Sequence, residues 1–164
     1  MSMMAVYQMA DDKKIKELLD MSQDEILAEW EKLQENEEGY LEIGELWDGL
    51  HCLMTGKTTS EIEDGNTLSE SITGTETFGT EDFIAYILSE KVLLISDALQ
   101  DFDIDSAIET FDPEVFAQKD VYPNIWEDED IEDLQEELNE NFCALKDFYK
   151  KAAEMGKGVI VGIY

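Results

Sequence analysis

The chain has 164 residues, 43% of them hydrophobic, so it is long enough to bury a core without help from disulfides or a metal. It carries 41 acidic residues against 11 basic ones, a formal charge of −30, and every basic residue is a lysine. This charge excludes nucleic acid and anionic membranes as partners, because a polyanion would be repelled and there is no arginine to bind phosphate. Two explanations of the charge stay open, a solvated surface that maintains solubility or a face presented to a basic partner.

The length of the chain and the distribution of its apolar residues predict one cytoplasmic domain over residues 1–164. No basic leader opens the chain, and no apolar run approaches the about 20 residues of a membrane span. We expect Cys52 and Cys143 to be small buried thiols in helices rather than a disulfide. One histidine and two isolated cysteines do not supply a zinc ligand set, so we expect neither a metal nor a cofactor.

The first third of the chain predicts a strand and two helices. The apolar run 3–9 is too short for a helix and reads as a buried strand. Asp11 or Asp12 then caps a helix to residue 21. Ser22 with Glu25 forms a capping box that opens a second helix, which ends at residues 36–39.

The next helix, predicted over residues 46–54, contains the most unusual chemistry of the chain. It includes the only histidine, and it places Trp47, Leu50, His51 and Met54 on one face at offsets of three and four residues. Gly56 stands where a helix stop is expected. The histidine and tryptophan therefore share one helix face.

A polar segment and a second strand follow. Residues 57–79 predict a long loop with a short element at 68–72, which is either the rim of a pocket or a surface excursion. Residues 82–88 read as an internal strand, after which Ser89 is expected to cap a helix over 90–101.

The last part of the chain predicts helices and a closing strand. A short helix is expected over 103–110, and Asp112-Pro113 begins another to residue 118. After the turn at residues 122–124, helical spacing holds over 128–155, and an apolar strand spans 158–164. The fold class is therefore α+β, a helix-dominated single domain with a small central sheet of about three strands, near 3–9, 82–88 and 158–164.

Several acidic and aromatic residues are candidates for a site. Asp48 lies three residues before His51, so its carboxylate should favour the protonated imidazole and orient it as a general base, although no nucleophile completes the set. A structural role for His51, packed beside Trp47, is the alternative. Asp101, Asp103 and Asp105 are spaced as in the start of an EF-hand loop.

Two features of the sequence argue that these acidic residues have structural roles rather than forming a metal-binding or catalytic site. Ser106 stands where the EF-hand requires glycine, so we expect no calcium site. The acidic run 127–130 matches the preference of a helix N-terminus for negative charge, and a docking site for a basic partner is its second interpretation.

Tyr122 with Trp126 predicts either a buried aromatic turn or the wall of a pocket.

The segment from Trp47 to Gly56, which we call the motif, resembles part of a known protein family. Residues 47–51 and 55–56 match the signature Trp-Asp-x-Leu-His…Thr-Gly of the YfbM-like family, small bacterial proteins of uncharacterised function. The opening strand, the pair 122–123 and the closing strand agree, so the resemblance covers nearly all of the chain. It implies an α+β domain of the bacterial cytoplasm and no established activity. Gly49 and Cys52 stand where the family often has bulkier apolar residues, which predicts looser packing at the motif.

Two functions of different class follow from these residues. We expect a non-enzymatic, acidic binding protein that meets a basic protein, with an inhibitor or immunity-type role as one form of this function. The alternative is a small-molecule-binding protein or a hydrolase-like enzyme. Its pocket would be formed by Trp47, Asp48, His51, Thr55, Tyr122 and Trp126.

Overall fold

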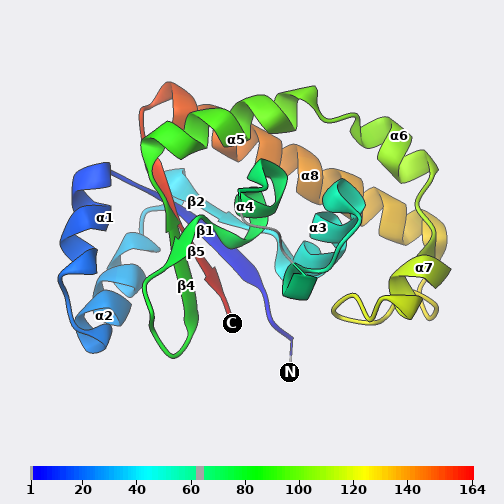
Figure 1. Cartoon of the computed structure of the whole chain (residues 1–164), viewed down its shortest axis with the longest axis horizontal. Helices are drawn as coiled ribbons and strands as arrows, with labels where there is room; N and C mark the ends of the chain where they lie inside the picture. The colour runs from blue at the N-terminus through cyan, green and yellow to red at the C-terminus, as the bar shows by residue number, and fades with distance from the viewer. Residues whose placement is uncertain (1, 62–64) are drawn as a thin grey trace.

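A five-stranded antiparallel sheet in the order β2-β1-β5-β4-β3 forms the centre of the protein (Figure 1). The computed structural model describes residues 2–61 and 65–164. The strands are β1 (Ala5–Ala10), β2 (Tyr40–Glu42), β3 (Glu76–Thr77), β4 (Phe83–Ile87) and β5 (Gly158–Ile163). The closing strand β5 therefore lies between the opening strand and the middle one, and the sheet joins all parts of the sequence.

The predicted α+β class is confirmed, and the three predicted strands correspond to β1, β4 and β5. The predicted number of strands is too low because the two edge strands were missed. β2 has three residues and β3 has two, and both are largely exposed. Neither carries the apolar alternation that identifies a strand in a sequence.

Eight α-helices surround the sheet among the described residues. They are α1 (Asp12–Leu19), α2 (Gln23–Leu33), α3 (Trp47–Thr55), α4 (Thr67–Thr73), α5 (Ser89–Asp101), α6 (Ile104–Glu109), α7 (Pro113–Gln118) and α8 (Ile131–Glu154). Short 3-10 turns lie at Glu37–Gly39, Gly44–Leu46 and Thr59–Glu61. Within the described part of the chain, none of the helices has the length and apolar character needed to cross a membrane.

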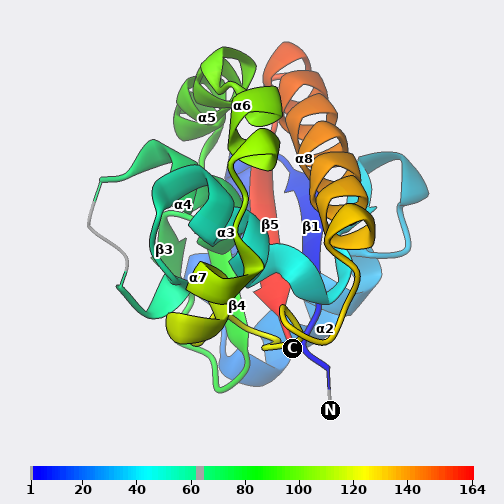
Figure 2. The same cartoon turned by 90° about the vertical axis from the view of Figure 1, so that its right-hand side faces the viewer.

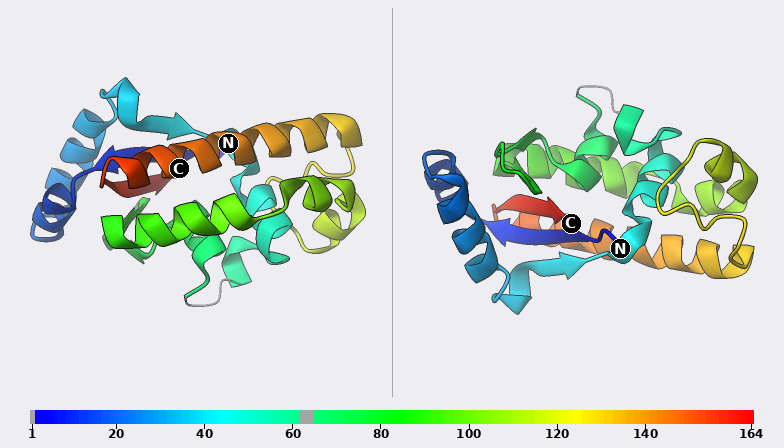
Figure 3. Two further views of the ribbon diagram at one scale, coloured as in Figure 1. Left: turned by 90° about the horizontal axis from the view of Figure 1, so that it is seen from above. Right: turned by 90° about the horizontal axis from the view of Figure 1, so that it is seen from below.

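Different helices pack against the two faces of the sheet. Along β1, Tyr7 and Met9 face the larger core, while Val6 and Ala10 face a smaller core with Trp30 of α2. Helices α5 and α8 lie side by side over the larger core, as seen in Figures 2 and 3. Helices α1 and α2 lie at one end of the long axis, and α6 and α7 lie at the other (Figure 1).

The helix caps confirm some of the sequence predictions and correct others. Ser22 and Glu25 form the predicted capping box, with both reciprocal bonds present. Asp11 stands at the N-cap position of α1 but makes no capping hydrogen bond, and it pairs instead with Lys157. The prediction that Ser89 caps α5 is wrong, because Ser89 is the first helical residue and donates from its backbone N and its Oγ to Asp12.

The two cysteines are separate free thiols. Cys52 is buried in α3, whereas Cys143 is exposed on α8, so the prediction that both are buried holds for one of them. Burial raises the pKa of the Cys52 thiol, which keeps it protonated and unreactive.

The segment 57–79 contains more structure than predicted. The short element expected at 68–72 is helix α4, and β3 follows it directly. Residues 62–64 of the predicted loop lie outside the described residues. Two buried tyrosines fix the end of α4, since the Tyr149 hydroxyl donates to the Ser71 carbonyl at 2.8 Å and the Tyr7 hydroxyl donates to the Ile72 carbonyl at 2.9 Å.

Replacing Tyr149 with phenylalanine should destabilise the protein. The change keeps the ring and leaves the buried Ser71 carbonyl without this donor, so the free energy of unfolding should fall by about 1–3 kcal/mol in urea denaturation. Tyr40→Phe is the matched control, because the Tyr40 hydroxyl bonds to Glu42 on the exposed edge. Equal losses in the two variants would contradict a special role for the buried phenol.

Candidate functional site

Helix α3 carries the unusual residues and is almost entirely interior. It begins at Trp47, and seven of its nine residues are buried. Gly56 ends it in the left-handed conformation at φ 78°, where its N–H donates to the Cys52 carbonyl at 2.7 Å. The predicted helix and its glycine stop are both confirmed. The side chains of α3 therefore act mainly inside the protein.

The Asp48 carboxylate binds backbone from two distant segments. Its Oδ1 accepts from the Thr59 N–H at 2.8 Å, and its Oδ2 accepts from the Tyr122 N–H at 2.9 Å. Asp48 is 4% exposed, so both bonds form in a site that excludes water. Both carboxylate oxygens bond to backbone rather than to His51.

His51 is enclosed between two other segments. Its Nδ1 lies 2.7 Å from the Lys57 carbonyl, which accepts only, so Nδ1 carries the proton. Its Nε2 then accepts from the Ser69 hydroxyl at 2.8 Å. His51 is fully buried and Ser69 is 2% exposed. The imidazole thus joins α3 to the start of α4.

The pKa of His51 is lowered, contrary to the effect expected from its neighbour. Burial is the largest cause and disfavours the imidazolium, while the Lys57 carbonyl and the Asp48 charge act in the opposite direction. The Asp48 charge does raise the pKa of His51, as predicted, but the lowering of this pKa by burial is larger. Burial therefore favours a neutral His51 imidazole, and both of its nitrogens are hydrogen-bonded.

Trp47 and Tyr122 form a stacked pair over the start of the chain. Their ring centroids lie 5.4 Å apart at an interplanar angle of 27°. The Trp47 Nε1 donates to the Met3 carbonyl at 2.9 Å, and the Tyr122 hydroxyl accepts from the Met3 N–H at 2.6 Å. Both backbone groups of Met3 are thereby held by aromatic side chains.

Trp126 is buried and packs directly on α3. A Cβ added to Gly49 would lie 2.3 Å from Cη2 of Trp126, so only glycine fits at this contact. Trp126 also donates from Nε1 to the Val121 carbonyl at 2.8 Å and meets Phe116 edge to face. The prediction of looser packing at Gly49 is therefore wrong, because the indole fills the space that a larger side chain would take.

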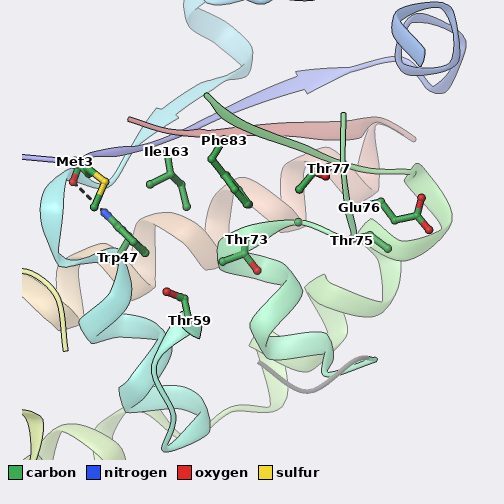
Figure 4. A pocket seen from close by; sticks show the side chains of 10 residues that line it. Met3, Trp47, Thr59, Thr73, Thr75, Glu76, Thr77, Phe83 and Ile163 are labelled. Carbon is green, nitrogen blue, oxygen red and sulfur yellow. Dashed lines mark hydrogen bonds between the residues drawn. The ribbon is translucent and has the colours of Figure 1, made fainter. Parts of the chain in front are cut away.

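The six predicted site residues thus lie close together without forming one open pocket. Asp48, His51 and Trp126 are buried, while Thr55 and Tyr122 are partly buried. Trp47 forms part of the wall of a cleft of about 400 Å³ between α3, α4 and the ends of β4 and β5 (Figure 4). We call this the Trp47 cleft.

Sequence reasoning missed the residues that the tertiary structure adds. Ser69 bonds to His51 from 18 positions away, and Thr59 bonds to Asp48. Asn66 caps α4 through the Ser69 N–H, a local signal that could have placed the helix. No local signal could have shown which side chain that helix would meet.

Three of the carboxylates within residues 101–130 cap helices. Asp103 accepts from the Ser106 N–H at the start of α6, and Asp130 accepts from the Glu132 N–H at the start of α8. Asp112 caps α7 ahead of Pro113, as predicted. In residues 2–61 and 65–164, no group of three or more histidine, cysteine, aspartate or glutamate residues is arranged to hold a metal ion.

Replacing Asp48 with asparagine should cost more stability than removing a surface charge. The amide keeps one acceptor oxygen and turns an NH₂ group toward a backbone donor, so the free energy of unfolding should fall by about 2 kcal/mol or more. Chemical denaturation measures this, with Asp97→Asn on the exposed face of α5 as control. A loss no larger than that of the control would show that the two backbone bonds contribute little.

The contribution of His51 to stability should depend on pH. Its folded pKa lies below the unfolded value of about 6.5, so the unfolded chain binds the proton more readily between the two values. The stabilisation is complete above the unfolded pKa and decreases as the pH falls below it. The difference in free energy of unfolding between the wild type and His51→Gln should therefore be larger at pH about 7.5 than at about 5.5.

That comparison removes the titration of the many carboxylates, which the two proteins share. A difference that does not change between these pH values, or that grows on acidification, would contradict a buried neutral imidazole.

Comparison with known proteins supports the predicted resemblance. The fold is similar to the crystal structure of YfbM from Escherichia coli, a protein of unknown function, with a TM-score of 0.78 and 19% identity over 98% of this chain and 99% of that chain. The chain has no match among the curated proteins. The model of a domain of unknown function, DUF1877, matches residues 1–162. Because this match spans nearly the whole sequence, the chain belongs to the DUF1877 family.

Proposed function

We propose that this chain is a non-enzymatic binding protein that takes a basic amphipathic helix of a partner protein at its acidic end. The observation that carries the proposal is an apolar groove of about 450 Å³ between α3, α6 and α7. It lies within the most acidic part of the molecule. We call it the acidic-end groove.

The negative charge is concentrated at one end. Residues 101–140 contain sixteen acidic residues and one lysine, a formal charge of −15, which is half of the total of −30. This segment forms α6, α7 and the first part of α8, at the opposite end of the long axis from α1 (Figure 1). Helix α1 carries three lysines, Lys13, Lys14 and Lys16. A basic partner is therefore attracted to one end in particular.

The groove adds apolar contacts to this attraction. Leu53, Phe102 and Val115 line it, and Val115 is 37% exposed. Asp103 and Asp112 lie at the same groove. An amphipathic helix fits this combination, because its apolar face enters a groove while lysine or arginine side chains beside that face meet carboxylates.

The buried state of Asp48 and His51 also supports binding over catalysis. Both residues are enclosed, and their polar atoms bond to other parts of the chain. Ser69 and His51 are within hydrogen-bond distance, as in a hydrolase, but both lie away from solvent. A hydrolase-like function therefore has less support. An inhibitory or immunity-type role toward a basic protein is one form of the proposed function.

A designed peptide pair tests the proposal. The probe is a helical peptide of about 18 residues, roughly five turns, with leucine on one face and lysine elsewhere, and its partner has glutamate in place of lysine. The lysine peptide should bind, with affinity falling at least about tenfold between about 50 and 200 mM salt. The glutamate peptide should not bind. Fluorescence anisotropy of labelled peptides measures both.

Matched variants locate the binding surface. Replacing Asp105, Glu109 and Glu114 with their amides should weaken binding and reduce its salt dependence. The control removes three exposed carboxylates, Glu17, Asp20 and Glu31, from the α1 and α2 end and should have a smaller effect.

A single apolar change tests the groove itself. Val115→Ser should lower the affinity at every salt concentration and leave the salt dependence unchanged, since it removes apolar contact without changing charge. The proposal fails if the two peptides bind equally, or if the control at the opposite end weakens binding as much as the change at the acidic end.

A further inference from the structure

The Trp47 cleft is a second concave surface, and it opens from the larger core of the protein. Trp47 and Ile163 line the cleft and both belong to that core. Phe83 and Thr77 lie on the same face of the sheet as Ile163, and Met3 completes the apolar surface (Figure 4). The volume of about 400 Å³ is within the range of about 300–1,000 Å³ that is typical of small-ligand sites.

None of the described residues that line the cleft directs a charge into it. Glu76 borders the cleft, but it pairs with Tyr86 across the sheet, and the Tyr86 hydroxyl donates to its Oε2 at 2.8 Å on the opposite face. Figure 4 shows the Glu76 carboxylate pointing away from the other side chains. The other nine lining residues are uncharged. A charged ligand would therefore lose its water in the cleft without gaining a counter-charge.

The wall of the cleft on the side of α3 is fixed by contacts within the chain. The Trp47 Nε1 donates to the Met3 carbonyl, and Tyr122 stacks on the indole ring. The Thr59 backbone is held by its N–H bond to the Asp48 carboxylate. The cleft therefore has its shape before any ligand arrives, which lowers the entropy cost of binding.

The polar groups of the cleft are threonine hydroxyls. Those of Thr73 and Thr75 donate to acceptors on α4. The hydroxyls of Thr59 and Thr77 have no hydrogen-bond partner among the described residues and can each donate to or accept from a ligand. The cleft thus combines apolar surface with neutral hydrogen-bonding groups, as is typical of sites for small organic molecules.

We propose that the Trp47 cleft binds a small, uncharged aromatic molecule that carries a hydrogen-bonding group. Its ring lies against Phe83 and Ile163, and its polar group bonds to the hydroxyl of Thr59 or Thr77. The formal charge of −30 opposes an anion, and the cleft has no carboxylate to receive a cation. This site goes beyond the proposed function and is separate from the acidic-end groove, so either proposal can fail without the other.

Three probes with one ring system and different charge test this site. Indole-3-acetamide is neutral, indole-3-acetate is an anion of nearly the same shape, and tryptamine is a cation. In ¹H–¹⁵N NMR titrations, indole-3-acetamide should shift the amide signals of residues 73–77 and the indole signal of Trp47. Each charged probe should bind at least about tenfold more weakly, which corresponds to about 1.4 kcal/mol.

Two variants on one strand test whether the probe occupies the cleft. Both residues of β3 are exposed, and their side chains lie on opposite faces of the sheet. Thr77→Phe places a ring in the cleft and should weaken binding of indole-3-acetamide at least about tenfold. Glu76→Phe, the matched control, places the same ring on the other face and should preserve this binding. Both variants should bind the lysine peptide at the acidic-end groove as the wild type does.

Three results would overturn the proposal. One is that indole-3-acetamide does not shift the cleft signals at millimolar concentration. Another is that tryptamine or indole-3-acetate binds as tightly as the neutral probe, which would show that the cleft does not select for an uncharged ligand. The third is that Thr77→Phe weakens binding no more than Glu76→Phe does, which would place the probe elsewhere.

Discussion

The buried carboxylate of Asp48 joins three segments that are far apart in the sequence, and the Trp47 cleft depends on the arrangement it holds. One oxygen positions the backbone at Thr59, which lines the Trp47 cleft, and the other positions Tyr122, which stacks on Trp47. Charge-assisted hydrogen bonds that backbone N–H groups donate to a water-excluded carboxylate are strong and directional. His51 adds a second connection, from α3 to Ser69 at the start of α4.

Helix α3 lies between two concave surfaces that differ in their chemistry, the Trp47 cleft and the acidic-end groove. On one side of α3, Trp47 borders a cleft whose other lining residues include Phe83, Ile163 and several threonines. On the other, Leu53 borders a groove within an end of the molecule where residues 101–140 carry a formal charge of −15. The long helix α8 links the lysine-bearing end to the acidic one.

Much of the fold was predictable because its signals are local. The capping box at Ser22, the Asp112-Pro113 start of α7 and the glycine stop at Gly56 depend on neighbouring residues, and all three are confirmed. The three apolar strands were found because they are buried on both faces of the sheet. β2 and β3 were missed because a short, exposed edge strand is held by its partner's backbone, which leaves no pattern in its own side chains.

The sequence by itself determined the fold class, the family resemblance, the strong negative charge and the helix that carries Trp47, Asp48 and His51. Only the tertiary structure decided what those side chains do. It surrounds His51 with α3, Lys57 and Ser69, so desolvation outweighs the Asp48 charge and keeps the imidazole neutral. It also packs Trp126 against Gly49, where the sequence suggested a gap. Burial and long-range contact are properties of the folded chain, and they determine whether a polar residue becomes part of the core or of a binding surface.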